Sequence, residues 1–338
     1  MPGANSYSVP GDTGGNREDL RNVLTVLEPE ETPVVSSMKK GPGPNATFVE
    51  VLADTLDSVN RTGIPEGQDV TSFDNKATKR ARFGNYIHIS RRSFGVTDVQ
   101  QLVDTAAVDS EYDYGKRKAV QELKRDVEAV VCGGQDRTSG DQDTPWATRG
   151  LFDWIDSAGP GDVPSSFRTP SAQIHAGSAI TEVALNGILQ SLFEVHGTKK
   201  SYMAVFSPEL IELVDYFTRV ELAATNYQGS GSGGSVGRFK VNDNNSSKTI
   251  SMEVKTFNSS FGKLALVPSV FLNTDANGTF DDDAGLILDT SLLELQTMDN
   301  LHTVDMTDEG GGKRGYTKVI YSLCCKSPRG LAKLTAAD

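Results

Sequence analysis

The chain has 338 residues, with 33 Lys and Arg against 45 Asp and Glu, a formal net charge of -12 and a pI near 4.9. This length allows two or three compact units with a buried core, and the acidic balance excludes a protein that coats nucleic acid through its whole surface. Cys132, Cys324 and Cys325 lack CxxC spacing, which predicts neither a disulfide framework nor a zinc site and favours a reducing compartment.

Residues 1–44 are predicted to form an N-terminal arm. Residues 1–16 are rich in Gly, Ser, Asn and Pro, and a short helix is predicted near 17–27, closed by Pro29 and Pro33. The beginning does not read as a secretory signal, and no apolar run in the chain approaches the ~18 residues of a membrane span. We expect cytosol-like surroundings.

Residues 45–92 are predicted to form an extended hairpin loop. Thr47, Val49 and Val51 alternate on one face of the first strand, and a return strand is predicted at 81–94. About thirty mostly polar residues lie between the strands, and each arm of roughly fourteen residues could reach about 45 Å at ~3.3 Å per residue. Because a two-stranded ribbon alone in water is marginal, we expect the tip to rest on another molecule.

Residues 93–175 are predicted to form a unit built on one long helix. Apolar residues recur at helical spacing over 98–131, which at 1.5 Å per residue predicts a helix roughly 50 Å long. Gly133 and Gly134 are expected to end it. The segment GLFDWI, 150–155, is predicted to be a short strand.

Residues 176–300 alternate helical and strand patterns, which predicts an α/β unit. Ser207 is expected to cap its second helix, with Pro208 at the first helical position. The predicted helices are 181–195 and 207–219, and the predicted strands are 201–206, 250–257, 263–267 and 286–295. A last segment, 301–338, carries a strand at 315–325 that alternates buried and exposed positions, with one face made of Val319, Tyr321, Leu323 and Cys325.

Catalytic signals are poor. The sequence has no GxSxG, P-loop, strand-to-helix GxGxxG or HExxH motif. Its four histidines, which we expect to be exposed or hydrogen-bonded in structural roles, are His88, His175, His196 and His302.

Two loops carry partial sequence signals of ligand sites. In 273–283, NTDANGTFDDD, the first positions match a calcium loop, but Ala284 stands where a bidentate Glu belongs, so a solvated turn is the better interpretation. The Gly and Ser of 226–237 could cradle a phosphate, but no strand-to-helix junction follows, which favours a linker or interface loop.

A basic strip covers 76–92, KATKRARFGNYIHISRR, with six Lys or Arg and no acid. Interleaved aromatics would suit single-stranded nucleic acid. In so acidic a chain, pairing with acidic groups of a neighbouring copy is the favoured interpretation, the candidates being Glu66, Asp69, Asp104 and Asp109.

Several phrases together resemble the major capsid (head) proteins of tailed bacteriophages, most closely a podophage-type family. They are NREDLRNVLTVLEPEETPVVSSM, the Glu66-Gly67 pair in the loop, RARFGNYIHISRRSFGVTDVQ, the helix end ELKRDVEAVV and, more loosely, SYMAVFSPELIELVDYF. The resemblance implies an α+β capsid fold, shared with encapsulins and herpesviruses. It has an N-terminal arm, an extended loop at 45–92, a spine helix at 98–131 in a peripheral domain, an axial domain at 176–300 and a returning strand in 301–338.

The resemblance also implies hexamers and pentamers that close into an icosahedral virion head around double-stranded DNA, assembled in the bacterial host cytoplasm. It implies no catalysis and no cofactor, a separate scaffolding protein, a portal and possible decoration proteins, enclosed DNA without sequence-specific contacts, and no membrane. Candidate inter-subunit contacts are Glu66, Gly67, Asp69, Lys79, Arg80, Arg82, Arg91 and Arg92. The alternatives are an encapsulin-like nanocompartment shell and a hydrolase that uses Asp281 to Asp283.

Overall fold

The computed structural model describes residues 31–103, 108–176, 180–217, 256–274, 280–307 and 310–335. Several predicted features lie outside these residues: the helix at 17–27, the loop at 226–237, and the central positions of the calcium-like loop.

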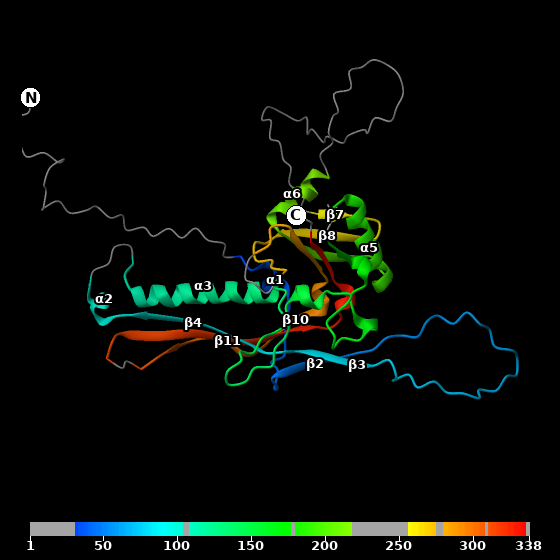
Figure 1. The fold of residues 1–338 in the computed structure, drawn as a ribbon, viewed down its shortest axis with the longest axis horizontal. Coiled ribbons are helices and arrows are strands. Elements are labelled where there is room, and N and C mark those ends of the chain that lie inside the picture. The colour runs from blue at the N-terminus through cyan, green and yellow to red at the C-terminus, as the bar shows by residue number, and fades with distance from the viewer. Residues whose placement is uncertain are drawn as a thin grey trace, which may run out of the picture.

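An elongated platform forms one part of the molecule (Figure 1). It is a four-stranded sheet in the order β1-β10-β11-β4, with α3 lying along β4 and β11. The strands β10 and β11 are long and antiparallel, and β1 joins the edge in parallel. The elements are β1 Lys39–Gly41, β4 His88–Val96, β10 Leu293–Asp305, β11 Lys313–Cys325, α1 Pro33–Ser37, α2 Asp98–Leu102, α3 Glu111–Val131 and α4 Leu151–Trp154.

A compact α/β unit lies on one side of the platform (Figure 1). Its six-stranded sheet has the order β5-β12-β9-β6-β8-β7, with β6 and β8 parallel. The elements are β5 Ile174–His175, β6 Lys200–Phe206, β7 Thr256–Asn258, β8 Gly262–Pro268, β9 Ala284–Leu288, β12 Ala332–Thr335, α5 Glu182–His196 and α6 Pro208–Tyr216. Short 3-10 turns are Ser165–Phe167, Ser171–Gln173, Thr290–Leu292 and Pro328–Gly330.

A separate hairpin of β2 (Phe48–Ala53) and β3 (Ala81–Tyr86) projects from the platform (Figure 1). The segment α2 lies at the opposite end of the long axis. The hairpin and α2 therefore mark opposite ends of the molecule.

Both predicted helices of the α/β unit form, and their ends show why. The Thr181 hydroxyl accepts a hydrogen bond from the Ala184 amide at 3.2 Å, and Gly197 ends α5 at φ +68°, which glycine adopts at no steric cost. Pro208 stands at the first position of α6. The Ser207 hydroxyl does not cap this helix as predicted, because it donates to the Asp282 carbonyl instead.

Apolar alternation was a reliable guide to the core of the platform. One face of β11 is buried at all four predicted positions, Val319, Tyr321, Leu323 and Cys325. These residues pack in a cluster with α3 side chains such as Leu123 and Val127, and a second cluster fills the α/β unit. The cysteines Cys132, Cys324 and Cys325 are free and buried.

The single helix predicted over 98–131 is wrong. The segment α2 ends at Leu102, Val103 is extended, and α3 begins only at Glu111 after an N-cap at Ser110. At 1.5 Å per residue the 21-residue α3 is about 32 Å long. The Ser110 hydroxyl accepts from the Asp113 amide, so a local cap restarts the helix where the apolar pattern is weak.

Two predicted strands are each two strands in different sheets. The return strand at 81–94 divides at Ile87 into β3 and β4, so Ile87 is buried but Ile89 is 45% exposed. The strand at 286–295 divides at a 3-10 turn, where Asp289 accepts from the Ser291 amide at 2.9 Å. A period of two reports extended backbone and does not report a change of sheet.

The segment 150–155 is helical, not a strand. Leu151, Phe152 and Trp154 of α4 are all buried, and so short a run of mostly apolar residues cannot be assigned from periodicity.

The sheets also divide the chain differently from the predicted boundaries. The strand β10 belongs to the platform from Leu293, before the boundary at 300, and β12 returns to the α/β sheet between β5 and β9.

Candidate inter-subunit surface

The base of the hairpin is buried in the platform. Val49 and Phe83 are 9% and 3% exposed, and the ring of Phe83 lies 6.1 Å from that of Trp154. Asn85 is 1% exposed, and its amide nitrogen donates to the carbonyls of Arg149 at 3.2 Å and Leu323 at 2.9 Å. The Arg149 amide donates back to Asn85 Oδ1 at 2.7 Å. One side chain thus joins the hairpin to β11 and to the loop before α4.

Arg137 holds the hairpin from the other side. Its guanidinium lies 4.9 Å from the ring centroid of Phe48 and 5.7 Å from that of Tyr86, the first pair in the register of β2 and β3. It also donates to the Gly84 carbonyl. Such cation–π contacts are stabilising and directional, so they fix the guanidinium over the end of the ribbon.

Arg137 belongs to a group of ionic side chains, Asp136, Arg137, Arg149, Asp153 and Asp162, that we name the base cluster. The Arg149 side chain is 2% exposed and lies within 2.8 Å of a carboxylate oxygen of each of the three aspartates. The guanidinium of Arg149 also lies 4.8 Å from the Trp154 ring centroid. Burial acts to raise the pKa of Asp136, but the hydrogen bonds and charge of Arg149 outweigh it and leave this pKa lowered. Burial raises the pKa of Asp153 to about 6.

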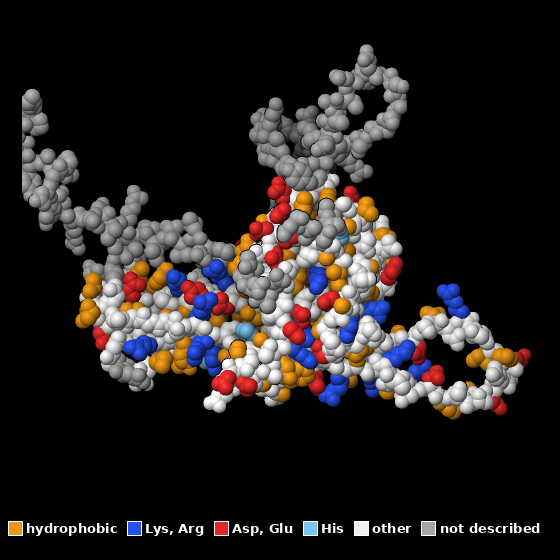
Figure 2. All heavy atoms as spheres, viewed as in Figure 1, with side chains coloured by type: hydrophobic (Ala, Val, Ile, Leu, Met, Phe, Trp, Pro, Cys, Tyr) orange, Lys and Arg blue, Asp and Glu red, His pale blue; other side chains and the backbone are white. Residues whose placement is uncertain are grey.

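The loop between the strands, 54–80, has the opposite character. It makes a turn at Pro65–Gln68 in which the Gln68 amide donates to the Pro65 carbonyl at 3.3 Å and Gly67 has φ +78°. A positive φ at the third residue of such a turn favours glycine, which explains the Glu66-Gly67 pair. Large apolar side chains along the loop are 72% to 96% exposed: Leu56, Val59, Ile64, Val70 and Phe73 (Figure 2).

Ion pairs across the loop occupy three of the predicted contact residues. Lys79 Nζ lies 2.5 Å from Asp57, and Arg80 Nε lies 3.3 Å from Asp54. Arg82 pairs with Glu50 on the neighbouring strand. Hydrogen bonds from Lys76 and Lys79 lower the pKa of Asp57 to about 2. These basic groups therefore have partners within their own hairpin before any neighbour is present.

The other predicted contact residues divide between the tip and the platform. Glu66, Gly67 and Asp69 are exposed at the turn, and no ion pair of Glu66 or Asp69 is found within the described residues. On β4, Arg92 makes two hydrogen bonds of 2.6 Å to Asp126 of α3, and the Arg91 guanidinium lies 5.8 Å from the Tyr316 ring centroid. The strip is thus not one surface. Of the predicted acidic partners, Asp109 is exposed and Asp104 lies outside the described residues.

The arm is anchored by a buried carboxylate. Glu128 of α3 is 0% exposed, and its two oxygens accept from the amides of Val34 and Val35 at 2.8 Å each. These amides belong to the first turn of α1, whose own N-cap residue, Thr32, gives no side-chain cap. Glu128 therefore caps a helix 94 residues away in sequence. Burial raises the pKa of Glu128.

The other end of the platform also exposes apolar side chains. Val99, Leu102 and Val103, in and next to α2, are 72%, 88% and 53% exposed. Uncovered apolar groups at both ends of an elongated subunit are typical of interaction surfaces.

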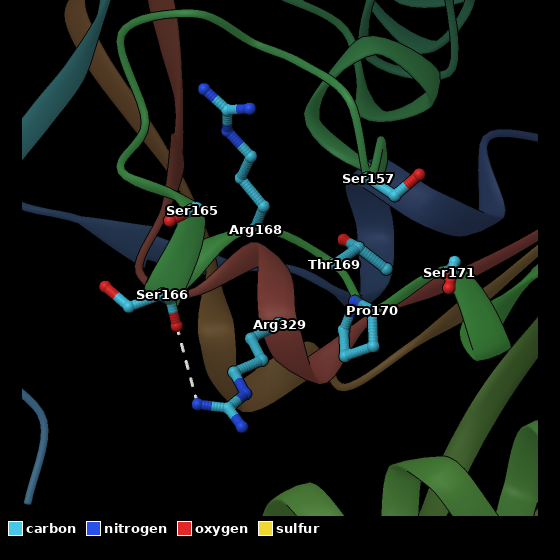
Figure 3. A pocket seen from close by; sticks show the side chains of 8 residues that line it. All are labelled: Ser157, Ser165, Ser166, Arg168, Thr169, Pro170, Ser171 and Arg329. Carbon is cyan, nitrogen blue, oxygen red and sulfur yellow. Dashed lines mark hydrogen bonds between the residues drawn. The ribbon is translucent and has the colours of Figure 1, made fainter.

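No convergent reactive centre appears in the part of the chain that the structure describes. A shallow pocket of about 390 Å³ is lined by Arg168, Arg329, serines, Thr169 and Pro170 (Figure 3). The two guanidiniums point away from one another. Arg168 donates to the carbonyls of Ala158 and Val163 at 2.7 Å, so it holds its own loop together.

Other candidate groups have structural partners. Asp281, one acid of the hydrolase alternative, accepts hydrogen bonds from the amide and hydroxyl of Thr274. His88, expected to be exposed or hydrogen-bonded, packs against Tyr321 with ring centroids 5.4 Å apart, and burial lowers its pKa. Over the described residues, no group of three His, Cys, Asp or Glu is placed to hold a metal ion, and no helix is long and apolar enough to cross a membrane.

Sequence reasoning missed the residues that hold the hairpin and the N-terminal arm in place. Asn85, Arg149 and Glu128 are single polar residues, and none belongs to a motif. The available signal for Glu128 was its position, because it directly follows Val127, which lies on the apolar stripe of α3.

A family model for the SU10 major capsid protein matches residues 5–338. The chain belongs to the SU10 major capsid protein family. It is therefore a structural component of the virion head and not an enzyme. This outcome confirms the predicted viral shell protein, and neither the nanocompartment nor the hydrolase alternative gains support.

Known capsid proteins share parts of this sequence and all of this fold. Over 131 residues the capsid protein is 30% identical to the major capsid protein of Escherichia phage Phieco32, a match that covers 38% of this chain and 36% of that relative. A solved chain from Gordonia phage Cozz aligns with TM-score 0.61 at 16% identity, covering 100% of this chain and 97% of that one.

The capsid of cyanophage P-SCSP1u aligns with the same TM-score at 12% identity, covering 95% of this chain and 93% of that one. At these identities the structural likeness shows the fold alone. The predicted α+β tailed-phage capsid fold is confirmed.

Proposed function

We propose that copies of this chain assemble into hexamers and pentamers that close as an icosahedral shell around double-stranded DNA, with the loop 54–80 of each copy lying over a neighbour. One observation carries the proposal. Five large apolar side chains of the loop, all at least 72% exposed, have no cover from the described residues of their own chain. Burying such a side chain contributes about 1.5–3 kcal/mol, and a neighbouring copy would supply the cover.

The contrast between base and loop supports this arrangement. The buried base fixes where the ribbon leaves the platform, and the cross-strand ion pairs of Lys79, Arg80 and Arg82 hold its two sides together. A limb that is directed in advance loses less conformational freedom when it docks. Many such contacts in a closed shell reinforce one another, so each can be modest.

The predicted contact residues take different parts in this proposal. Glu66, Gly67 and Asp69 form the tip and would meet the neighbour directly. Lys79, Arg80 and Arg82 would stiffen the loop and share their charges with the neighbour only at its edge. Arg91 and Arg92 would act from the platform, where β4 is the edge strand of the sheet.

In the same proposal the platform is the peripheral domain, with α3 as its spine, and the α/β unit is the axial domain around the capsomer centre. A separate scaffolding protein and a portal would be partners during assembly, and decoration proteins could bind outside. The acidic chain, with its net charge of -12, suits a container that encloses DNA without sequence-specific contacts.

Deleting residues 56–78 tests the loop. We expect a folded subunit with an unchanged unfolding transition that forms no shells by negative-stain microscopy and sedimentation. A milder pair of variants sharpens the test: Val59→Ser in the loop should impair assembly, whereas Val183→Ser on α5, which removes the same side chain at similar exposure (84% against 80%), should not. Uniform shells from the deletion variant would overturn the proposal.

A further inference from the structure

The base cluster holds more negative than positive charge around the buried guanidinium of Arg149. Asp136, Asp153 and Asp162 surround Arg137 and Arg149, which leaves one carboxylate in excess if all five are ionised. The side chains of Asp153 and Asp162 are 28% and 23% exposed and that of Arg149 is 2% exposed, whereas that of Asp136 is 67% exposed. A buried charge without a full partner is costly, so a proton is the simplest counterion.

Charged groups on the neighbouring elements do not remove the excess. Lys333 of β12 is attracted to Asp153 and also to Asp156, and its ammonium donates to the Phe152 carbonyl at 3.0 Å. When Lys333 and Asp156 are added to the base cluster, three cations face four carboxylates.

Hydrogen bonding singles out Asp153 within the cluster. Arg149 Nε donates to Asp136 Oδ1 at 2.9 Å, and Nη2 donates to Asp136 Oδ1 at 2.6 Å and to Asp162 Oδ1 at 2.8 Å. Asp153 Oδ2 lies 2.7 Å from Nε, yet this buried oxygen, like Asp162 Oδ2, receives no hydrogen bond among the described residues. Asp162 differs from Asp153 because its other oxygen accepts from Arg149 Nη2. Asp153 is therefore the carboxylate whose ionised form is least stabilised by hydrogen bonds.

The cluster is connected directly to the hairpin. Asp162 lies 3.2 Å from Arg137, which rests on Phe48 and Tyr86 of the ribbon. The backbone of Arg149 exchanges two hydrogen bonds with Asn85 of β3. A change of charge at Asp153 therefore reaches the base of the hairpin through one guanidinium.

We propose that the base cluster is a proton-linked clamp, in which Asp153 takes up one proton under mildly acidic conditions and tightens the attachment of the hairpin β2–β3 to the platform. Protonated Asp153 would leave two cations facing two carboxylates. At neutral pH the clamp carries one unpaired charge and is looser, which would make the direction of the loop sensitive to pH. Only this consequence for the loop rests on the proposed function.

The raised pKa of Asp153 sets the direction in which stability changes with pH. For a carboxylic acid whose pKa is about 6 in the folded chain and 3.8 in the unfolded chain, the stabilisation is complete below the unfolded value. It is lost as the pH rises through the folded value. Between pH 4.5 and pH 7 this group alone should raise the unfolding constant by on the order of 20-fold.

The test compares urea unfolding of the full-length chain, kept dilute and unassembled, with that of Asp153→Asn at pH 4.5 and pH 7. The variant cannot ionise at this position, so the ratio of its unfolding constant to that of the parent should fall by about 20-fold between the two pH values. Asp143→Asn, an exposed acid of the same 133–150 segment, is the matched control and should follow the parent. Equal pH dependence in the parent and Asp153→Asn would overturn the proposal.

A second readout locates the proton. With Trp146→Phe in the background, Trp154 is the remaining tryptophan, and its ring lies beside the Arg149 guanidinium. Its emission should titrate with a midpoint near pH 6, and Asp153→Asn should abolish that titration. A flat emission profile over pH 4.5–7.5 would contradict the clamp even if assembly through the loop proceeded normally. Because neither measurement requires a shell, failure here leaves the proposed function standing.

Discussion

Two phenylalanines ten residues apart in one hairpin have opposite environments. Phe83, in β3, is 3% exposed and packs near Trp154 and Phe167, whereas Phe73, in the loop, is 90% exposed. The same side chain that stabilises the platform at the base is available for a partner in the loop. The hairpin thus has a part that folds with its own chain and a part that we propose is completed by another.

The largest effect on stability should come from truncating Phe83 in the base, with Phe73 in the loop as the comparison. Phe83→Ala removes a buried ring and leaves a cavity, so we expect it to lower the free energy of unfolding by about 3–5 kcal/mol. Phe73→Ala should change it by less than about 0.5 kcal/mol. Urea unfolding measures both. A large loss of stability from Phe73→Ala would mean that the loop folds back on its own chain.

A comparable loss is expected where charge is buried. Arg149→Leu leaves three aspartates around an apolar side chain, and removing one partner of a buried ionic group costs about 3–5 kcal/mol. Arg61→Leu, at an exposed position of the loop, is the control and should lie within about 0.5 kcal/mol of the parent. Equal unfolding midpoints for the two variants would show that the base cluster contributes little.

A smaller loss is expected at the joint between hairpin and platform. Asn85→Ala removes bonds to the Arg149 backbone and leaves the Leu323 carbonyl without its 2.9 Å donor, which should cost about 1–3 kcal/mol. Hydrogen exchange should report faster opening of β3 amides such as that of Tyr86, with α5 amides unchanged. Uniform acceleration in both places would indicate a global effect and not a local joint.

The smallest effect is expected at the ion pairs of the loop. Asp57→Asn removes contacts with Lys76 and Lys79, but these side chains are well exposed, and salt screens such pairs. We expect no shift of the urea midpoint at ordinary ionic strength. A stabilising role would appear as a clear shift at low salt, and its size would then measure how ordered the isolated loop is.

Local sequence patterns were sufficient to predict a helix or strand where one face of that element meets the core. The alternation in 315–325 and the capped helix at 181–195 were predicted because a half-buried surface imposes its period on the sequence. The prediction of one helix over 98–131 failed because an extended residue at Val103 and a cap at Ser110 interrupt an amphipathic pattern without erasing it.

The anchoring residues could not be predicted in the same way. Glu128 meets Val34 and Val35 across 94 and 93 residues, and Asn85 meets Leu323 across 238. A polar residue in a sequence signals exposure unless its partner is known, and these partners come from other parts of the chain.

The amino-acid sequence by itself determined the acidic, non-catalytic character of this capsid protein, its long polar excursion between two strands, and the family phrases that point to a phage head. Only the tertiary structure decided that the excursion's apolar groups stay uncovered and that buried ions fix its base. The reason is that composition and period are local properties, whereas burial and charge pairing depend on contacts between residues far apart in the chain.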